Sequence, residues 1–365
     1  MENTFLDFFA GSGLVSEGLR DYFRPIWAND ISRKKVDIYL SNHDTDIFIL
    51  GSIRNIHGSV VPEAMLSWGS FPCQDISLAG KQNGLASARS GLVWEWLRVM
   101  DEMKSHPPII VAENVVGLLS SNNGHDYKDI HASLVNRGYN VGAVILDASS
   151  WVPQSRKRVF VIAVKKNVDI SRNITDGPIW CHTRKIVEIA NNIHDWTWWY
   201  MPKPSARMNS IEDIVEKNAS CLSNEKAMHL LKLIPDSHIK RVEKAIQNGR
   251  WAFPGYRRIR HGNQVLELRF DGLAGCLRTP SGGSSRQYIV LFKDNQLCIR
   301  LLTIDEASQL MGAGREYKLP GSYNDAYRAM GDAVVVPVTK YIAENLLYPI
   351  SREIEETHVQ RAICL

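Results

Sequence analysis

The 365-residue sequence has no long apolar runs, and no stretch reaches the roughly 18 consecutive apolar residues that a membrane-spanning helix needs. Its first 13 residues also lack the basic region and apolar core of a secretory signal. These absences argue against a membrane protein and an exported protein. We therefore expect a cytoplasmic protein with no membrane partner.

Cysteine is scarce and scattered, with six residues in the whole chain. They stand at positions 73, 181, 221, 276, 298 and 364, with no CxxC pair and no histidine cluster nearby. This spacing favours neither a zinc site nor a disulfide framework, so we expect no bound metal. A cysteine that matters should therefore act as a thiol.

The excess of positive charge is small, +4 overall, but it is unevenly placed. Residues 239–260 carry seven Lys or Arg against the single acid Glu243, with Trp251, Phe253 and Tyr256 among them. Basic residues mixed with aromatics suit a phosphate backbone and stacked bases. A solvated helix face followed by a loop explains the same pattern equally well.

The first ~165 residues alternate short apolar runs with helix-like segments, a pattern typical of a parallel sheet flanked by helices. The fold class is therefore α/β. We expect strands within residues 4–11, 25–30, 63–70, 108–115, 139–148 and 158–166, and helices within 13–23, 92–103 and 129–138.

The regular alternation stops after about residue 168 and returns near residue 300. Residues 300–313 contain a helix with a cap signal, and residues 331–350 read as a turn, an apolar run and a helix. We therefore predict a first domain at 1–168, a smaller irregular domain at 169–299, and a return to the first domain at 300–365.

A glycine turn follows the first predicted strand. In "LDFFAGSGLVSEGL", Asp7 is near the strand end, and Gly11 and Gly13 precede a helix whose free N–H groups could face a ligand. Asp30 ends the next strand, where a carboxylate can accept hydrogen bonds from ribose hydroxyls. A tight strand-to-helix turn without a ligand is an equally good explanation.

Cys73 follows Pro72 at the end of a predicted strand, where open parallel sheets form their ligand crevice. Burial as an inert thiol is the commoner fate of a cysteine. Glu113 ends another predicted strand and is a candidate proton donor. Gln154, Arg156 and Arg158 enter a third strand at alternate positions, so we expect them to point to one face. Together these residues describe a thiol, an acid and cations around one crevice.

The order of these segments resembles that of the bacterial cytosine-5 DNA methyltransferase family along nearly the full chain. The matching blocks are "FAGSG", "SFPCQ", "AENV", "QSRKR", "RLLTIDEASQLMG" and "GDAVVVPV". The resemblance implies a Rossmann-like class I methyltransferase sheet with helices on both faces. It also implies that residues 1–168 form the catalytic and cofactor-binding domain, to which 300–365 return, and that the irregular, basic region at 169–299 is a target-recognition domain.

The resemblance implies a catalytic set of Cys73, Glu113, Arg156 and Arg158. The thiolate of Cys73 would add to carbon 6 of cytosine and activate carbon 5, which is otherwise a poor nucleophile. Glu113 would hold or protonate ring N3, and Arg156 would bind the carbonyl oxygen of the base. Arg158, like Asn114 and Gln154, is expected to act mainly in holding the site together.

The resemblance also implies S-adenosylmethionine as the methyl donor. Asp30 would bind its ribose and Ile31 would pack on its adenine. Ser52 stands where the family has an acid, and Asp332 stands where it has asparagine. The full set of expected cofactor-binding residues is Phe9, Gly11, Gly13, Asp30, Ile31, Ser52, Ile53, Pro72, Leu92, Asp332 and Ala333.

Two glycine-rich segments are candidates for DNA contact. Residues 77–91, rich in glycine and small residues, suit a loop that closes over DNA. Gly282 and Gly283 lie in a second loop that is loaded with polar donors, although a simple β-hairpin turn gives the same pattern. In this second loop we predict DNA contacts from Arg278, Thr279, Ser284, Arg286 and Gln287.

The sequence thus predicts a DNA cytosine-5 methyltransferase that flips its target base out of double-stranded DNA. We expect it to act as a monomer, with a cognate restriction endonuclease acting separately. Two alternatives stay open at this point. One is a related enzyme that methylates cytosine in RNA, and the other is a DNA-binding relative that has lost catalysis.

Overall fold

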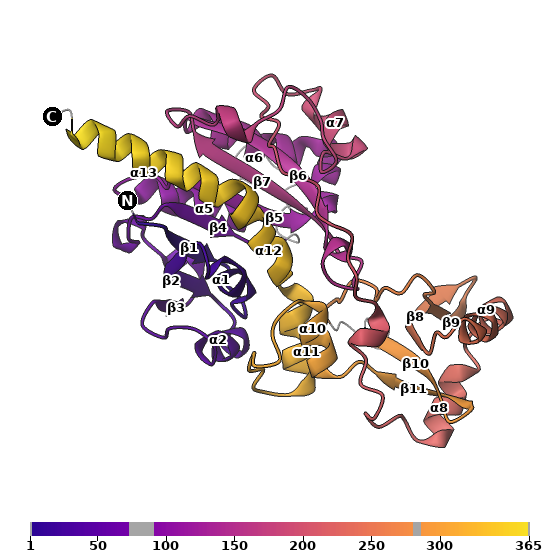
Figure 1. The fold of residues 1–365 in the computed structure, drawn as a ribbon. Helices are drawn as coiled ribbons and strands as arrows, with labels where there is room; N and C mark the ends of the chain where they lie inside the picture. Colours follow the sequence, from indigo (N-terminus) through magenta and orange to yellow (C-terminus); the bar gives the residue numbers. More distant parts are fainter. Residues whose placement is uncertain (1, 73–90, 280–285, 364–365) are drawn as a thin grey trace. The chain divides into compact units, whose positions relative to one another are not determined.

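The computed structural model describes residues 2–72, 91–279 and 286–363 (Figure 1). The chain divides into two compact units. Unit 1 comprises Met1–Leu146, Lys157–Pro204 and Val338–Leu365, and unit 2 comprises Asp147–Arg156 and Ser205–Pro337. The predicted division into residues 1–168, 169–299 and 300–365 describes functional regions and not compact units. It remains a prediction.

Unit 1 is built on a seven-stranded sheet in the order β3-β2-β1-β4-β5-β7-β6. Its strands are β1 (Thr4–Phe8), β2 (Arg24–Asp30), β3 (Phe48–Leu50), β4 (Leu66–Gly69), β5 (Ile109–Val115), β6 (Tyr139–Asp147) and β7 (Lys157–Lys165). The strands from β3 to β5 pair in parallel, so their carboxyl ends meet at one edge of the sheet. That edge is where open α/β sheets place their ligands.

The expectation of a parallel sheet is wrong at one strand, because β7 runs antiparallel to β5. Residues 148–156, which lead from β6 to β7, contain one short 3₁₀ turn and no α-helix. A crossover between parallel strands needs a dozen or more residues and is usually an α-helix. The apolar composition of β7 did not reveal its direction.

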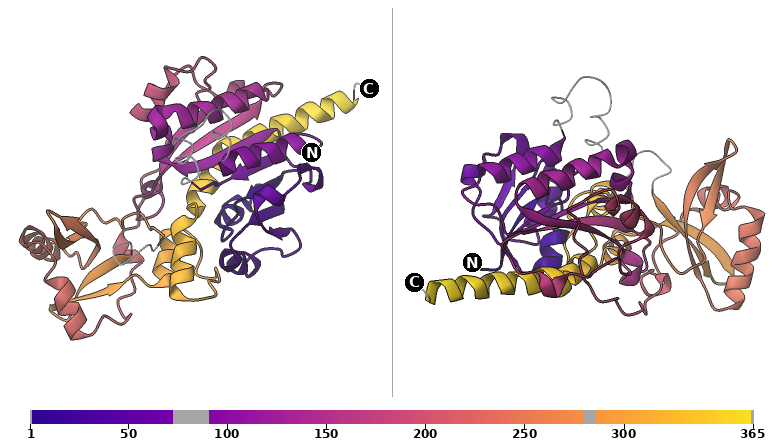
Figure 2. Two further views of the ribbon diagram at one scale, coloured as in Figure 1. Left: turned by 180° about the vertical axis from the view of Figure 1, so that it is seen from behind. Right: turned by 90° about the horizontal axis from the view of Figure 1, so that it is seen from above.

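Helices cover both faces of the unit 1 sheet. They are α1 (Leu14–Leu19), α2 (Arg33–Leu40), α5 (Leu92–Glu102), α6 (His125–Asn136), α7 (Arg184–Ala190) and α13 (Tyr348–Ile363). Figure 2 shows α5 and α6 on one face and α13 on the other. This arrangement confirms the predicted α/β class. Within the described residues, no helix combines the length and apolar character needed to cross a membrane.

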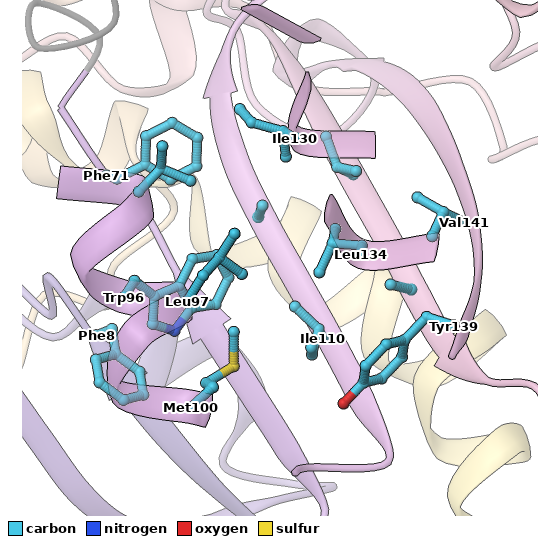
Figure 3. Packing of buried hydrophobic residues seen from close by; sticks show 14 of the residues in the cluster. Phe8, Phe71, Trp96, Leu97, Met100, Ile110, Ile130, Leu134, Tyr139 and Val141 are labelled. Carbon is cyan, nitrogen blue, oxygen red and sulfur yellow. The ribbon is translucent and has the colours of Figure 1, made fainter. Parts of the chain in front are cut away.

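The main core of unit 1 lies between the sheet and the helices α5 and α6. Trp96 and Met100 of α5 pack toward Phe8 of β1, and Ile130 and Leu134 of α6 lie toward β5 and β6 (Figure 3). A Cβ atom on Gly69 would lie 2.9 Å from the Trp96 ring, so glycine allows α5 to approach β4 closely. This packing fixes the strand ends that carry the candidate site.

Unit 2 contains a four-stranded antiparallel sheet in the order β11-β10-β8-β9. The strands are β8 (Ala252–Arg260), β9 (Asn263–Leu268), β10 (Gln287–Lys293) and β11 (Gln296–Leu301), and the helices are α8 (Asn224–Leu231), α9 (Asp236–Gln247), α10 (Ile304–Leu310) and α11 (Tyr323–Asp332). One face of the sheet buries Phe253, Val290 and Ile299 with Leu230 of α8 and Val242 of α9. The predicted basic segment 239–260 is therefore divided between a helix and a strand.

The two blocks that follow the sheet are mostly helical. Thr303 caps α10 through a capping box with Glu306, as the sequence predicted. Residues 331 and 332 end α11 rather than forming a separate turn. After them, α12 (Val336–Ile342), a π-helical turn (Ala343–Leu347) and α13 follow one another directly.

Candidate active site

The carboxyl end of β5 carries a buried ion pair. Arg158 Nε lies 3.0 Å from Glu113 Oε1, and the two side chains are only 15% and 8% exposed. The pair joins neighbouring strands, because Val115 of β5 is the register partner of Arg158 in β7. A charge pair with so little water around it is held in one orientation far better than a surface pair. Glu113 is thus a positioned carboxylate at the ligand edge of the sheet.

Asn114 fixes the chain that leads to Cys73. Its Nδ2 donates to the carbonyl oxygen of Phe71 at 2.9 Å, and its Oδ1 accepts from the N–H of Val115 at 2.9 Å. These bonds tie the segment after β4 to the end of β5. Phe71 is buried and Pro72 is exposed. Cys73 itself, and the predicted closing loop from residue 77 to residue 90, lie outside the described residues.

Arg156 has a different environment from Arg158. Its two terminal nitrogens donate to the carbonyl oxygens of Leu277 at 3.0 Å, Gly331 at 3.0 Å and Ala333 at 2.6 Å. Arg156 is 2% exposed and belongs to unit 2. In this structure its guanidinium ties backbone segments together, which is the structural role that the sequence assigned to Arg158.

Gln154, Arg156 and Arg158 do not share one strand face, contrary to the expectation from their alternate spacing. The strand β7 begins only at Lys157, so the period of two does not extend back to Gln154 and Arg156. Gln154 instead forms an isolated bridge with Ala274. Its Nε2 donates to Leu310 O at 2.7 Å, so its role is structural, as expected.

The glycine turn after β1 is closed by Asp30. The N–H groups of Gly11 and Ser32 donate to the two carboxylate oxygens of Asp30, at 2.9 and 2.8 Å. Phe9, Gly11 and Gly13 all have positive φ, 58°, 57° and 82°, the region that glycine adopts most readily. Gly13 also has no room for a side chain, since a Cβ there would lie 2.5 Å from the His43 ring.

An exposed apolar surface borders Asp30. Ile31 directly follows it and is 72% exposed, and Leu50 of β3, the register partner of Asp30, is 41% exposed. A fixed carboxylate beside apolar side chains suits a ligand with hydroxyl groups and a flat apolar ring, such as a nucleoside. The residues present here therefore fit the adenosine part of S-adenosylmethionine.

Other expected cofactor residues have mainly local partners. Ser52 is the N-cap of a 3₁₀ turn (Ile53–Asn55) and accepts a long hydrogen bond, 3.4 Å, from the N–H of Arg54. Ile53 is buried, and Leu92 is half-buried at the start of α5. Asp332 and Ala333 belong to unit 2, and Asp332 accepts a hydrogen bond from Thr279.

Asp7 lies beneath this turn as a fully buried acid. Its Oδ2 accepts from Ser16 Oγ at 2.8 Å, and Ser16 Oγ is 3.2 Å from the Tyr39 hydroxyl. Burial raises the pKa of Asp7 to about 7, while the Ser16 hydrogen bond opposes the shift and the nearby charge of Asp30 adds to it. Asp7 can therefore carry a proton close to neutral pH.

The family model for C-5 cytosine-specific DNA methylase matches residues 3–348 of the chain. The chain belongs to this family. The resemblance seen in the sequence motifs is thereby confirmed.

The methylase is similar to several Type II methyltransferases of bacteria. M.MspI of a Moraxella species is 26% identical over 349 residues, which cover 94% of this chain and 70% of that protein. M.FnuDI of Fusobacterium nucleatum is 27% identical over 361 residues, 96% of this chain and 94% of that protein. The Dnmt2 methyltransferase of S. pombe has the same fold, with a TM-score of 0.61 and 18% identity over 96% of this chain and 99% of that one.

The expected DNA-contact residues of the methylase differ in exposure. Arg278 is exposed, Thr279 and Arg286 are half-buried, and Ser284 lies outside the described residues. Gln287 is fully buried in β10, so the expectation that it faces DNA is wrong for this structure. The two-residue pattern of β10 turns its side chain toward Gly275 and not toward solvent.

Sequence reasoning missed the partner of Glu113. Arg158 was expected to have a structural role, because nothing in the sequence shows that β7 pairs with β5 and in which register. The only available signal was that Arg158 lies inside the predicted strand whereas Arg156 precedes it. The structure also adds Asp7 to the residues around the glycine turn as a titrating group.

Proposed function

We propose that this methylase transfers a methyl group from S-adenosylmethionine to carbon 5 of a cytosine within a specific sequence of double-stranded DNA. The observation that carries this proposal is the buried Glu113–Arg158 ion pair at the ligand edge of the sheet. It supplies an oriented carboxylate and a cation where the family resemblance requires groups that bind and protonate a cytosine ring.

Cys73 is the proposed nucleophile. Its thiolate attacks carbon 6 of the base, forms a carbon–sulfur bond and pushes the electron pair of the carbon 5–carbon 6 double bond toward carbon 5. Carbon 5 then takes the methyl group that S-adenosylmethionine supplies. Loss of the proton from carbon 5 restores the double bond and expels the thiolate. Asn114 supports this role because it anchors Phe71, two residues before Cys73.

Glu113 is the proposed partner of ring N3. A carboxyl group there holds the amidine edge of the base and gives a proton as negative charge enters the ring. The ion pair supports this assignment, because Arg158 restricts Glu113 to one orientation. We propose Arg158, rather than Arg156, as the cation nearest the base, since both terminal nitrogens of Arg156 already have carbonyl partners.

Asp30 and Ile31 are the residues we propose to hold the adenosine part of S-adenosylmethionine. The Asp30 carboxylate would accept hydrogen bonds from the ribose hydroxyls, and the exposed Ile31 would cover one face of the adenine. The N–H of Gly11, now bonded to Asp30, keeps that carboxylate in place. Phe9, Gly13, Ser52, Ile53, Pro72, Leu92, Asp332 and Ala333 complete the proposed cofactor set.

The target atom of a cytosine in duplex DNA lies inside the base stack, so the proposal includes flipping the base into the site. We further propose that the protein acts in the cytoplasm as a monomer, with any cognate restriction endonuclease acting separately. The relatives named above are Type II methyltransferases, which supports this association with restriction.

A direct test is tritiated methyl transfer from S-adenosylmethionine to plasmid DNA and to RNA, followed by bisulfite sequencing. We expect label in DNA only, at the cytosines of one short sequence. Cys73→Ala should abolish incorporation. Label in RNA alone would favour the RNA enzyme, and binding of DNA without label would favour the non-catalytic relative.

The covalent step can be tested on its own with DNA that contains 5-fluorocytosine. Fluorine cannot leave carbon 5 as a proton does, so the adduct should persist and slow the protein in a denaturing gel. Cys73→Ala should form no adduct. An adduct mapped to one of the other cysteines would contradict the proposed nucleophile.

A further inference from the structure

A two-stranded ribbon projects from the sheet of unit 2. The strand β8 pairs with β10 only from Ala252 to Tyr256, whereas it pairs with β9 as far as Arg260. Within the described residues, the last four residues of β8 therefore have β9 as their only neighbouring strand. A tight turn closes the ribbon at His261 and Gly262, whose φ values are 49° and 81°. Two positive φ values are typical of the turn that best fits twisted strands.

The tip of this ribbon (residues 259–264) is exposed and carries groups that read base edges. Asn263 and Gln264 make no side-chain hydrogen bond to any described residue, and Ile259, the register partner of Gln264, is 70% exposed. Arg260 is turned back along the ribbon, where it forms two hydrogen bonds with Glu267, of 2.6 and 2.9 Å. The tip thus offers two neutral amides, the imidazole of the exposed His261 in the turn, and one apolar side chain.

The base of the ribbon is positively charged. The Arg258 guanidinium lies 4.8 Å from the centre of the Tyr256 ring, and that of Arg257 lies 5.8 Å from the Tyr288 ring. These contacts hold both cations near the root of the ribbon, on its two faces, since adjacent strand residues point to opposite sides.

The dimensions of the ribbon fit the major groove of DNA. The projecting part of β8, from Arg257 to Arg260, spans three residue-to-residue steps, or about 10 Å at about 3.4 Å per residue. The major groove is about 8.5 Å deep and wide enough for a two-stranded ribbon. When the tip reaches the floor of the groove, Arg257 and Arg258 lie near the level of the phosphates. The amides then meet base edges and the arginines meet the backbone.

The geometry points to the β8–β9 ribbon as a sequence-reading element of the methylase, with Asn263 and Gln264 contacting bases in the major groove and Arg257 and Arg258 contacting phosphates. This inference rests on the proposed function only in taking double-stranded DNA as the partner. Asparagine and glutamine can each make paired hydrogen bonds with adenine, and an exposed isoleucine can meet the methyl group of thymine. The ribbon therefore contributes to the choice of site and not to the chemistry.

The position of other candidate residues supports the ribbon. Because β8 and β10 are antiparallel and Tyr256 faces Gln287, the beginning of β10 lies at the same end of the sheet as the ribbon. Arg286 immediately precedes that point. The β10–β11 turn, by contrast, lies at the opposite end of the sheet.

That second hairpin provides a matched control. Its turn, Asp294 and Asn295, also has positive φ values, and Asn295 and Gln296 are exposed like Asn263 and Gln264. It differs in projecting little beyond the sheet, since β10 and β11 pair along their whole length, and in carrying an acid at its tip. The variant Asn295→Ala/Gln296→Ala thus removes the same two side-chain types from the wrong end of the sheet.

The test selects bound sequences from a pool of random duplexes with the full chain and with three double variants. For Asn263→Ala/Gln264→Ala we expect discrimination between the selected and random sequences to fall by about 10-fold or more. For Arg257→Ala/Arg258→Ala we expect weaker binding to all duplexes and a salt dependence reduced by about 1 per arginine. The control Asn295→Ala/Gln296→Ala should select the wild-type sequence with unchanged affinity.

Each outcome decides the inference without relying on methyl transfer. Unchanged selection by Asn263→Ala/Gln264→Ala would overturn it, as would an equal loss of affinity for every duplex, which indicates backbone contact only. If the control variant loses selectivity as much as the ribbon variant, the ribbon has no special role. Failure of wild-type methyl transfer, with selection intact, would contradict the proposed function and leave the ribbon supported.

Discussion

Arg156 and Arg158 are separated by one residue in the chain, yet they belong to different compact units and have different kinds of partner. Arg158 faces the carboxylate of Glu113, so its charge is neutralised within a buried pair. Arg156 faces three backbone carbonyls from two segments, Leu277 in one and Gly331 and Ala333 in the other, so it acts as a connector within unit 2. A short motif thus places one arginine beside an acid at a strand end and the other among backbone carbonyls.

The largest effect should come from removing the acid of the buried pair. Glu113→Gln keeps the shape of the side chain but removes its ability to protonate ring N3, so we expect the methylation rate to fall by roughly 10²- to 10⁴-fold. Single-turnover methyl transfer measures the chemical step. The control is Glu17→Gln, which breaks a partly exposed pair with Arg20 and should leave the rate unchanged. A rate within twofold of wild type for Glu113→Gln would contradict the assignment.

The contrast between the two arginines predicts different losses of stability. Arg156→Met leaves three backbone carbonyls without their donor, so we expect the free energy of unfolding to fall by about 3 kcal/mol. Arg158→Met removes the cation beside the buried Glu113 carboxylate and should also destabilise by about 3 kcal/mol. Adding Glu113→Gln should restore the stability lost in Arg158→Met, because it removes the charge of the Glu113 carboxylate. It should not restore the stability lost in Arg156→Met. Urea unfolding of the wild type, the three single variants and the two double variants measures both cycles.

If Glu113→Gln also restored the stability of Arg156→Met, the contrast between Arg156 and Arg158 would be wrong, because both arginines would depend on the same acid. Absence of recovery for Arg158→Met would mean that the ion pair contributes nothing to folding. Either result is visible in the unfolding midpoints alone and does not depend on activity.

Asp7 adds a pH dependence to unit 1. Its pKa is raised from 3.8 to about 7 by burial, so the folded state binds a proton that the unfolded state releases. The stability that this proton contributes is complete below about pH 4 and is lost as the pH rises to about 7, by up to about 1.4 kcal/mol per pH unit. Asp7→Asn should remove this part of the slope. An identical pH profile for the variant would show that Asp7 is ionised throughout.

The sequence predicted the strands of unit 1 well because alternating apolar runs and glycine turns are local signals. It also identified Glu113 and Asp30 as acids at strand ends. It could not reveal the antiparallel direction of β7, since direction depends on how residues 148–156 connect two strands. For the same reason it could not show that Arg158 pairs with Glu113 whereas Arg156 binds backbone carbonyls. A spacing of two residues predicts a shared face only when both residues belong to the same strand.

Unit 2 was predicted less well, because its exposed polar residues follow no periodic pattern. The polar sequence around residue 282 led us to predict DNA contacts there, including one from Gln287, yet Gln287 is buried. The sequence did not predict the ribbon, because the basic segment 239–260 looked continuous although it spans most of α9 and all of β8. Which arginines project from the sheet depends on where β10 stops pairing with β8.

The smallest expected effect concerns two buried glutamines of unit 2, both 0% exposed. Gln154 is satisfied, because its Nε2 donates to Leu310 O at 2.7 Å and its Oε1 accepts from Leu277 N at 3.0 Å. The amide of Gln287 has no hydrogen-bond partner among the described residues. A buried polar group without a hydrogen-bond partner destabilises the fold. Removing a buried group that is hydrogen-bonded leaves its former partners without a hydrogen bond.

Methionine has nearly the volume of glutamine and no amide, so the same substitution should act in opposite directions at the two positions. Gln154→Met should lower the free energy of unfolding by about 2 kcal/mol, and Gln287→Met should leave it unchanged or raise it by up to about 1 kcal/mol. Thermal unfolding measures both. Equal destabilisation at the two positions would mean that the Gln287 amide is bonded in solution. If Gln287→Met is stable but binds DNA poorly, then this glutamine is kept for recognition at the expense of stability, as strained functional sites often are.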